Sequence, residues 1–176
     1  MKYFLSFDVG TTAMKCILFD TGFNMAAKVS KEYSLVIENG YTELDPEVYY
    51  NTLCTCISEI LNTGVNRDDI LSITFTTQGE TFLCVDKGGK PLTRAVIWLD
   101  ARADSEAKFI LNNIGTYEFY KTTGLWAPDG ALPLAKLLHI KKNTHDVYEK
   151  TYKFLLLEDY LVYRLTGKYV TEKSLA

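Results

Sequence analysis

The chain has 176 residues, and its 19 Lys and Arg against 22 Asp and Glu give a formal net charge of −3. Apolar residues make up 47% and charged residues 23%, which is the balance of a folded globular chain and excludes a disordered one. The mildly acidic balance argues against a nucleic-acid-binding surface, which needs clustered Lys and Arg. No apolar run approaches the length that spans a bilayer.

The N-terminal segment and the cysteines indicate a cytoplasmic location. Asp8 interrupts the apolar opening run before it reaches the length of a signal-peptide core. Four Cys are too few and too irregularly spaced for a disulfide scaffold or a zinc site, so we expect free thiols in a reducing compartment. His139 and His145 have no partner at metal-ligand spacing, and we expect both on the surface.

The first third of the chain reads as strands separated by turns. Tyr3–Val9 is apolar and aromatic, and Met14–Asp20 follows with alternating side chains after a turn at residues 10–12. A second turn at residues 21–24 leads into an extended run from Met25 to about Leu35. These patterns predict three consecutive strands.

The rest of the chain alternates between helices and strands. Asp45, Pro46 and Glu47 form a helix start, because Asp caps, Pro suits the first turn and Glu favours the positive end of the helix dipole. The pattern predicts strands at 71–77, 81–85 and 95–98, and further helices at about 102–113, 132–142 and 158–165, the last closing at Gly167. This order indicates a mixed α/β architecture. Residues 174–176 carry no terminus signal, so we expect the chain to be cut from a larger protein.

The turn between the first two strands has the composition of a phosphate-binding loop. Gly10 lets backbone N–H groups approach closely, and Thr11 and Thr12 add hydroxyl donors. Asp8 at the strand end can hold Mg²⁺ directly or through water, and Lys15 on the next strand can balance phosphate charge. The alternative interpretation is a plain hairpin with ordinary polar turn residues.

A second polar cluster interrupts the central strands. Gln78 and Glu80 follow one strand, and Trp98, Asp100 and Arg102 follow another. Carboxylate and amide groups beside an indole suit a polyol, whose hydroxyls they bind while the ring covers C–H surface. The alternative places Trp98 in the core, Asp100 at a helix N-terminus, and the other polar side chains in solvent.

Four ordered features of the chain together resemble the FGGY family of carbohydrate kinases, which includes glycerol kinase and xylulokinase. The stretches that carry the resemblance are the Asp-Val-Gly-Thr-Thr turn at residues 8–12 with Lys15 and residues 19–20, residues 41–47, residues 73–78 with 86–92 and 97–102, and residues 123–124 and 133–137 with 159–161 and 164–167. Each feature alone is weak, but their order along the whole chain is specific.

The resemblance implies an actin-like ATPase (ribonuclease H-like) fold with a mixed sheet and flanking helices. Residues 1–176 would be the N-terminal, sugar-binding domain, and the C-terminal nucleotide-binding domain would be absent. By resemblance, Asp8 lies near Mg²⁺ and ATP, residues 10–12 near the transferred phosphate, and Gln78, Glu80, Trp98, Asp100 and Arg102 along the sugar pocket. The catalytic base would be a downstream Asp, so we expect no catalytic residue here and no activity from this chain alone.

The resemblance implies transfer of the ATP γ-phosphoryl group to a hydroxyl of a small sugar. Glycerol kinases carry Arg between the Gln and Glu where this chain has Gly79, and xylulokinases carry Met-His where it has Gly79-Glu80. Asp100 favours the xylulokinase side, so a ketopentose such as xylulose is the first choice. A glycerol or other polyol kinase and a non-catalytic sugar- or nucleotide-binding module are the alternatives. We expect a small sugar as partner, neither nucleic acid nor membrane, and allow for a homodimer.

Overall fold

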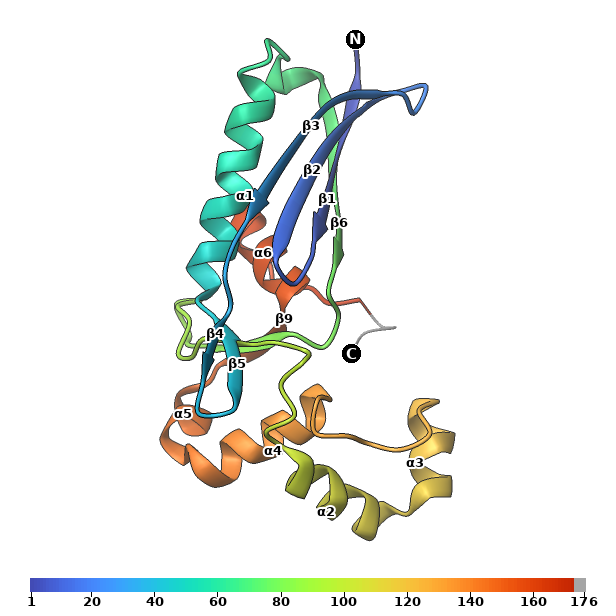
Figure 1. The fold of residues 1–176 in the computed structure, drawn as a ribbon, viewed down its shortest axis with the longest axis vertical. Coiled ribbons are helices and arrows are strands. Elements are labelled where there is room, and N and C mark those ends of the chain that lie inside the picture. Colours follow the sequence, from blue (N-terminus) through green and yellow to red (C-terminus); the bar gives the residue numbers. More distant parts are fainter. Residues whose placement is uncertain (173–176) are drawn as a thin grey trace.

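The computed structural model of the chain describes residues 1–172 and contains two β-sheets, one above the other in the view of Figure 1, with helices beside and below them. The expectation about residues 174–176 lies outside the described part. No helix in residues 1–172 is both long enough and apolar enough to cross a lipid bilayer.

The first sheet is mixed and has the strand order β3-β2-β1-β6. Its strands are β1 (Tyr3–Val9), β2 (Ala13–Asp20), β3 (Met25–Glu32) and β6 (Ile70–Thr77). β1 pairs antiparallel with β2 and parallel with β6. Alternate side chains of β1 and β2 are buried because a strand turns successive residues to opposite faces of its sheet.

Helix α1 (Pro46–Leu61) lies along this sheet (Figure 1). The Asp45 side chain accepts a hydrogen bond from the Glu47 N–H at 2.9 Å, which confirms the predicted N-cap. Tyr49 and Leu53 lie on the buried face of the helix and join the main core with the inward side chains of β1 and β2. The helix therefore holds an aromatic hydroxyl beneath the end of the sheet.

The second sheet is antiparallel throughout and has the order β4-β5-β8-β7-β9. Its strands are β4 (Val36–Glu38), β5 (Tyr41–Leu44), β7 (Phe82–Val85), β8 (Ala95–Val96) and β9 (Lys153–Leu156). Helix α6 (Leu157–Thr166) follows β9 directly and ends at Gly167, whose φ of 71° is the left-handed conformation of a helix C-cap. The predicted helix end is confirmed.

The remaining helices are α2 (Asp104–Ile114), α3 (Thr116–Thr123), α4 (Pro133–Asn143) and α5 (His145–Lys150), and a short 3-10 turn, η1 (Arg67–Asp69), precedes β6. Helices α2, α3 and α4 surround a smaller core below the second sheet (Figure 1), whereas α5 packs against the second sheet itself. Ala103, Ala107, Ile110, Phe119 and Ala135 are the buried members of this core. Helix α2 thus packs on α3 and α4 apart from the main core.

The mixed α/β prediction is confirmed, while several local expectations are wrong. The third strand ends at Glu32 instead of continuing to Leu35, and two short strands follow it. Helix α2 begins at Asp104, two residues after the expected start, and Asp100 does not cap it, because the Asp100 carboxylate accepts hydrogen bonds from Arg102 instead. One more expectation needs correcting: His139 is half-buried and lies 3.3 Å from Glu106, so it is not a surface residue, whereas His145 is exposed as expected.

We predict that Asp45→Ala lowers the free energy of unfolding by about 1 kcal/mol, because it leaves an N–H group of α1 without its acceptor. Urea unfolding of the 176-residue chain measures the change. Asp45→Asn keeps a capping oxygen and should stay close to the wild type. An equal loss in both variants would contradict a capping role.

Candidate functional site

The two polar clusters predicted from the sequence meet in one open cavity of about 560 Å³. β1 and β6 run parallel, and Asp8 lies opposite Thr76 in their register, so both strands deliver polar residues to the same edge of the sheet. The residues that line the cavity are Asp8, Val9, Gly10, Thr11, Thr77, Gln78, Gly79, Glu80 and Trp98. Members of both clusters therefore form its wall.

The turn after β1 presents backbone donors on one side of the cavity. The Gly10 N–H donates to the Ala13 carbonyl at 3.0 Å and closes the turn. Within residues 1–172, the backbone N–H groups of Thr11 and Thr12 donate no hydrogen bond. A Cβ atom on Gly10 would lie 3.1 Å from the Ala13 oxygen, so the tight turn favours glycine. Two free N–H groups beside small hydroxyls suit an anion such as phosphate.

Asp8 and Lys15 form an ion pair at the edge of this turn. The two residues are opposite each other in the β1–β2 ladder, and Lys15 Nζ lies 3.2 Å from Asp8 Oδ2. The Asp8 side chain is 50% exposed, which leaves its carboxylate accessible to a cation. No cluster of three or more His, Cys, Asp or Glu among the described residues could hold a metal alone. One carboxylate fits Mg²⁺ when phosphate oxygens and water complete the shell.

The indole of Trp98 joins the other side of the cavity to the turn. Its Nε1–H donates to Thr11 Oγ1 at 3.0 Å, and its backbone N–H donates to Thr81 Oγ1 at 3.0 Å. The side chain is 41% exposed, so the alternative that placed it in the core is wrong. Glu80 precedes Thr81 with a φ of 57°, an uncommon conformation for a residue with a side chain. Such strain is found where a side chain is held for function.

Gln78 is bound on one side and free on the other. Its Nε2 donates to the Tyr49 hydroxyl at 2.8 Å and lies 3.5 Å from the Gly10 carbonyl oxygen. Its Oε1 is buried and has no hydrogen-bond partner among the described residues. Because buried polar atoms are normally paired, this oxygen is a candidate acceptor for a ligand hydroxyl.

Asp100 and Arg102 lie outside the cavity wall in this structure. Arg102 binds both Asp100 oxygens at 2.7 and 2.8 Å, reaches Glu43 at 2.9 Å and stacks over the Tyr41 ring. The Asp100 carboxylate also accepts from the Thr42 N–H at 2.6 Å. Burial raises the pKa of Asp100, but these hydrogen bonds outweigh it and hold the pKa below its usual value. Their predicted contact with sugar stays a prediction, and their contacts here fasten β5 to the segment after β8.

Lys136 of α4 is a functional candidate that the sequence reasoning missed. Its side chain is fully buried, and Nζ donates to the Ile97 carbonyl at 2.8 Å, one residue before Trp98. Burial lowers the pKa of Lys136 to about 8, although the charges of Asp100 and Glu80 oppose that shift. The only signal in the sequence is a lysine on the apolar face of a helix.

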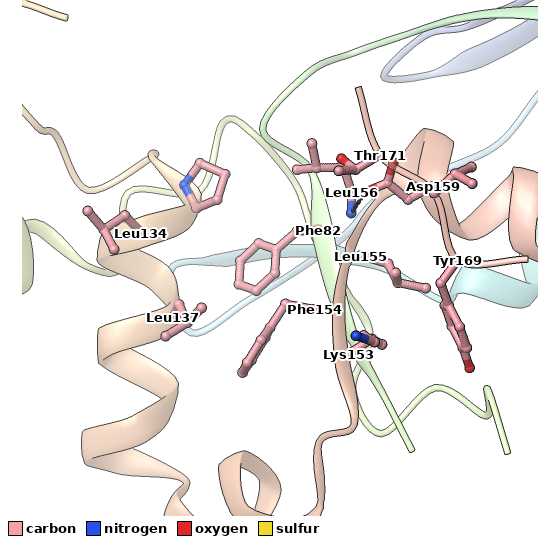
Figure 2. A pocket seen from close by; sticks show the side chains of 12 residues that line it. Phe82, Leu134, Leu137, Lys153, Phe154, Leu155, Leu156, Asp159, Tyr169 and Thr171 are labelled. Atoms are coloured by element: carbon pink, nitrogen blue, oxygen red, sulfur yellow. Dashed lines mark hydrogen bonds between the residues drawn. The ribbon is translucent and has the colours of Figure 1, made fainter. Parts of the chain in front are cut away.

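A second cavity, of about 360 Å³, differs in chemistry from the first (Figure 2). Its lining includes Leu134 and Leu137 of α4 on one side and Phe82 and Phe154 of the second sheet on the other, as Figure 2 shows. None of the site residues predicted from the sequence lines it. Its mainly apolar wall lacks the phosphate-binding donors found at the first cavity.

The comparison with protein families identifies the chain. The model of the N-terminal domain of the FGGY family of carbohydrate kinases matches residues 3–176. The chain belongs to the FGGY family of carbohydrate kinases. Its similarity to a xylulose kinase of Staphylococcus xylosus is 32% identity over 99% of the chain and 36% of that kinase. A glycerol kinase of Thermococcus kodakarensis is also 32% identical, over 98% of the chain and 36% of that kinase.

Solved FGGY structures share the fold. A ligand-bound xylulose kinase from Lactobacillus acidophilus matches 99% of the chain and 35% of that kinase, with a TM-score of 0.89 and 29% identity. A gluconate kinase from the same organism matches the same shares with a TM-score of 0.89 and 30% identity. The chain thus spans little more than a third of the relatives it matches. The resemblance and the fold class inferred from the sequence are confirmed.

We predict that Lys136→Met removes a pH-dependent contribution to the stability of this FGGY domain. The pKa of Lys136 is about 8 when folded, below that of an unfolded lysine, so the unfolded chain binds more protons from pH 8 to about 10.5. Over that window the wild type should gain about 3 kcal/mol of unfolding free energy relative to the variant.

Urea unfolding at several pH values measures this difference. Lys141→Met, at an exposed lysine of the same helix, is the matched control and should show no such rise. A difference between wild type and Lys136→Met that is the same at pH 7.5 and pH 10.5 would contradict the prediction.

Proposed function

We propose that the protein carrying this chain is an ATP-dependent kinase that phosphorylates a hydroxyl of a small sugar. One observation carries the proposal: part of the predicted phosphate loop (Asp8, Gly10 and Thr11) and part of the polar sugar cluster (Gln78, Glu80 and Trp98) line the same cavity. The Trp98–Thr11 hydrogen bond joins the two parts. A kinase of this kind must hold phosphate and hydroxyl side by side, because phosphoryl transfer depends chiefly on positioning and charge stabilisation.

Each wall of the cavity has a distinct task in this proposal. The N–H groups of Thr11 and Thr12 hold phosphate oxygens, and Asp8 binds Mg²⁺ with Lys15 beside it. Glu80 and Gln78 Oε1 accept hydrogen bonds from sugar hydroxyls, while the exposed indole of Trp98 covers C–H surface. When bound, ATP with Mg²⁺ supplies the transferable phosphoryl group and neutralises its charge.

We propose a ketopentose such as xylulose as the first substrate. Xylulose kinases of S. xylosus and Bacillus subtilis are 32% and 30% identical to the chain. Glycerol kinases and a gluconokinase match at similar identity, so they keep other polyols and sugar acids as the alternative. Gly79 has no side chain to bind a hydroxyl between Gln78 and Glu80. This favours a sugar whose hydroxyls extend as far as the Glu80 carboxylate.

The proposal divides the site between this chain and further residues of the kinase. A downstream Asp takes the hydroxyl proton, so the 176-residue chain alone should not turn over. We further propose a cytoplasmic enzyme, consistent with the free thiols of its cysteines. Assembly into a homodimer stays a prediction, which sedimentation of the full-length protein tests.

The first test is a panel of sugars in a coupled ATP assay on the kinase at its full natural length. We predict the largest kcat/KM for a ketopentose, with glycerol and gluconate as the comparison substrates. Preference for either comparison substrate would replace the ketopentose assignment. Sugar binding without turnover on any substrate would favour the non-catalytic module.

The second test is Asp8→Ala in the same protein. We predict that kcat falls at least about 100-fold, because the phosphate site loses the carboxylate placed for Mg²⁺, while the Kd for sugar changes little. Activity assays and calorimetry measure the two quantities. Asp20→Ala is the matched control, since Asp20 ends the neighbouring strand β2 opposite Tyr3, at the other end of the β1–β2 ladder from Asp8. Weakened sugar binding with intact turnover would contradict the assigned role.

A further inference from the structure

We propose that Tyr33 and Tyr49 are positioning residues that fix the phosphate loop against the sugar side of the cavity, Tyr33 by binding the loop directly and Tyr49 through the Gln78 amide. The inference rests on the proposed function, since it concerns the same cavity. It adds two residues that lie behind the cavity wall, because neither tyrosine lines it.

Tyr33 binds the phosphate loop at two points. It follows β3, and its hydroxyl donates to the Gly10 carbonyl at 2.5 Å. Its backbone N–H donates to the Thr12 carbonyl at 3.0 Å. One residue therefore holds the carbonyl groups at both ends of the Gly10–Thr12 segment, and the N–H groups of Thr11 and Thr12 stay free to face a ligand.

Tyr49 supports the sugar side from beneath. It is fully buried on α1, and its ring meets the Tyr33 ring edge-on with centroids 5.1 Å apart. Its hydroxyl accepts a hydrogen bond from Gln78 Nε2 at 2.8 Å. The Gln78 backbone N–H donates to the Val9 carbonyl at 3.1 Å, and Nε2 also lies 3.5 Å from the Gly10 oxygen. The amide thus bridges the strand end of β6 and the loop after β1.

The chain of contacts runs across the whole site. It passes from Tyr49 through Gln78 to Gly10, and from the same loop through Thr11 to the Trp98 indole. Burial raises the pKa of Tyr33, as do the nearby Tyr49 and Asp8, and burial also raises the pKa of Tyr49. Both hydroxyls therefore stay protonated at neutral pH, and the Tyr33 hydroxyl keeps its role as a donor.

For Tyr33 the expected effect is on the rate of phosphoryl transfer, not on sugar affinity, because its hydroxyl does not line the cavity and removing it takes no contact from the sugar. For Tyr49 both quantities should change, because its hydroxyl holds the amide of Gln78, which lines the cavity. A looser Gly10–Thr12 segment would misplace the phosphate relative to the attacking hydroxyl, and small displacements of this kind cost large factors in rate.

The experiment uses the kinase at its full natural length with Tyr33→Phe and Tyr49→Phe. We expect kcat to fall about 10-fold or more in each variant, with the KM for sugar within about twofold of the wild type in Tyr33→Phe and raised in Tyr49→Phe, which frees the Gln78 amide. The controls are Tyr163→Phe, which removes a hydroxyl bound to the Gly88 carbonyl, and Tyr160→Phe, which removes a fully buried hydroxyl bound to Glu47. Both controls should keep kcat within about twofold.

A second readout needs no turnover. Residues 1–176 contain two Trp, so Trp98 is the only indole of a kinase that carries Trp126→Phe and has any tryptophan outside residues 1–176 replaced by Phe. Its fluorescence then reports its hydrogen bond to Thr11. Tyr33→Phe should shift the emission or change its quenching by iodide, and Tyr163→Phe should not. Thermal melting of each variant separates this local change from loss of the fold.

The proposal requires both results for Tyr33→Phe: a lower kcat at unchanged KM and an altered Trp98 signal. Either change alone overturns it, as does an equal kcat loss in the controls or a loss that tracks a lower melting temperature. A wild-type kinase with no turnover on any sugar would refute the proposed function instead, so the two failures are distinguishable.

Discussion

The parallel pairing of β1 with β6 is the constraint on which the candidate site depends. It brings two strands far apart in the sequence to one edge of the sheet, and their side chains leave that edge as neighbours. The hairpin after β1 contributes the loop, and the segment after β6 contributes the polar cluster. Helix α1 packs its buried side chains against one face of this sheet and carries Tyr49, whose hydroxyl binds the Gln78 amide.

Local patterns in the sequence were sufficient for the long elements. The apolar run of β1, the alternation in β2 and the cap of α1 depend on neighbouring residues, and all three predictions were confirmed. The short strands β4, β5 and β9 were missed, because each is stabilised by partners distant along the chain and has too few residues to show a period. The antiparallel second sheet therefore depends on tertiary contacts, which local sequence patterns do not predict.

The candidate site likewise contains residues that the sequence predicted and residues that only the structure revealed. Residue types alone indicated the phosphate loop, since glycine, small hydroxyls and a carboxylate are the groups that such a loop needs. The contacts of Asp100 with Thr42 and Glu43, and the burial of Lys136, are set by packing between separate elements. No spacing along the chain reports them, so only the folded structure distinguishes a side chain on the cavity wall from one that braces it.

The left-handed backbone of Glu80 has a consequence for how this position can change. Glycine would adopt the same turn without the steric cost that a Cβ atom brings, so the backbone by itself favours the smaller residue. Retaining a carboxylate there exchanges some conformational free energy for a charged group aimed into the cavity. Replacing Glu80 by glycine should therefore stabilise the fold, but the same change would remove the carboxylate proposed to bind the ligand.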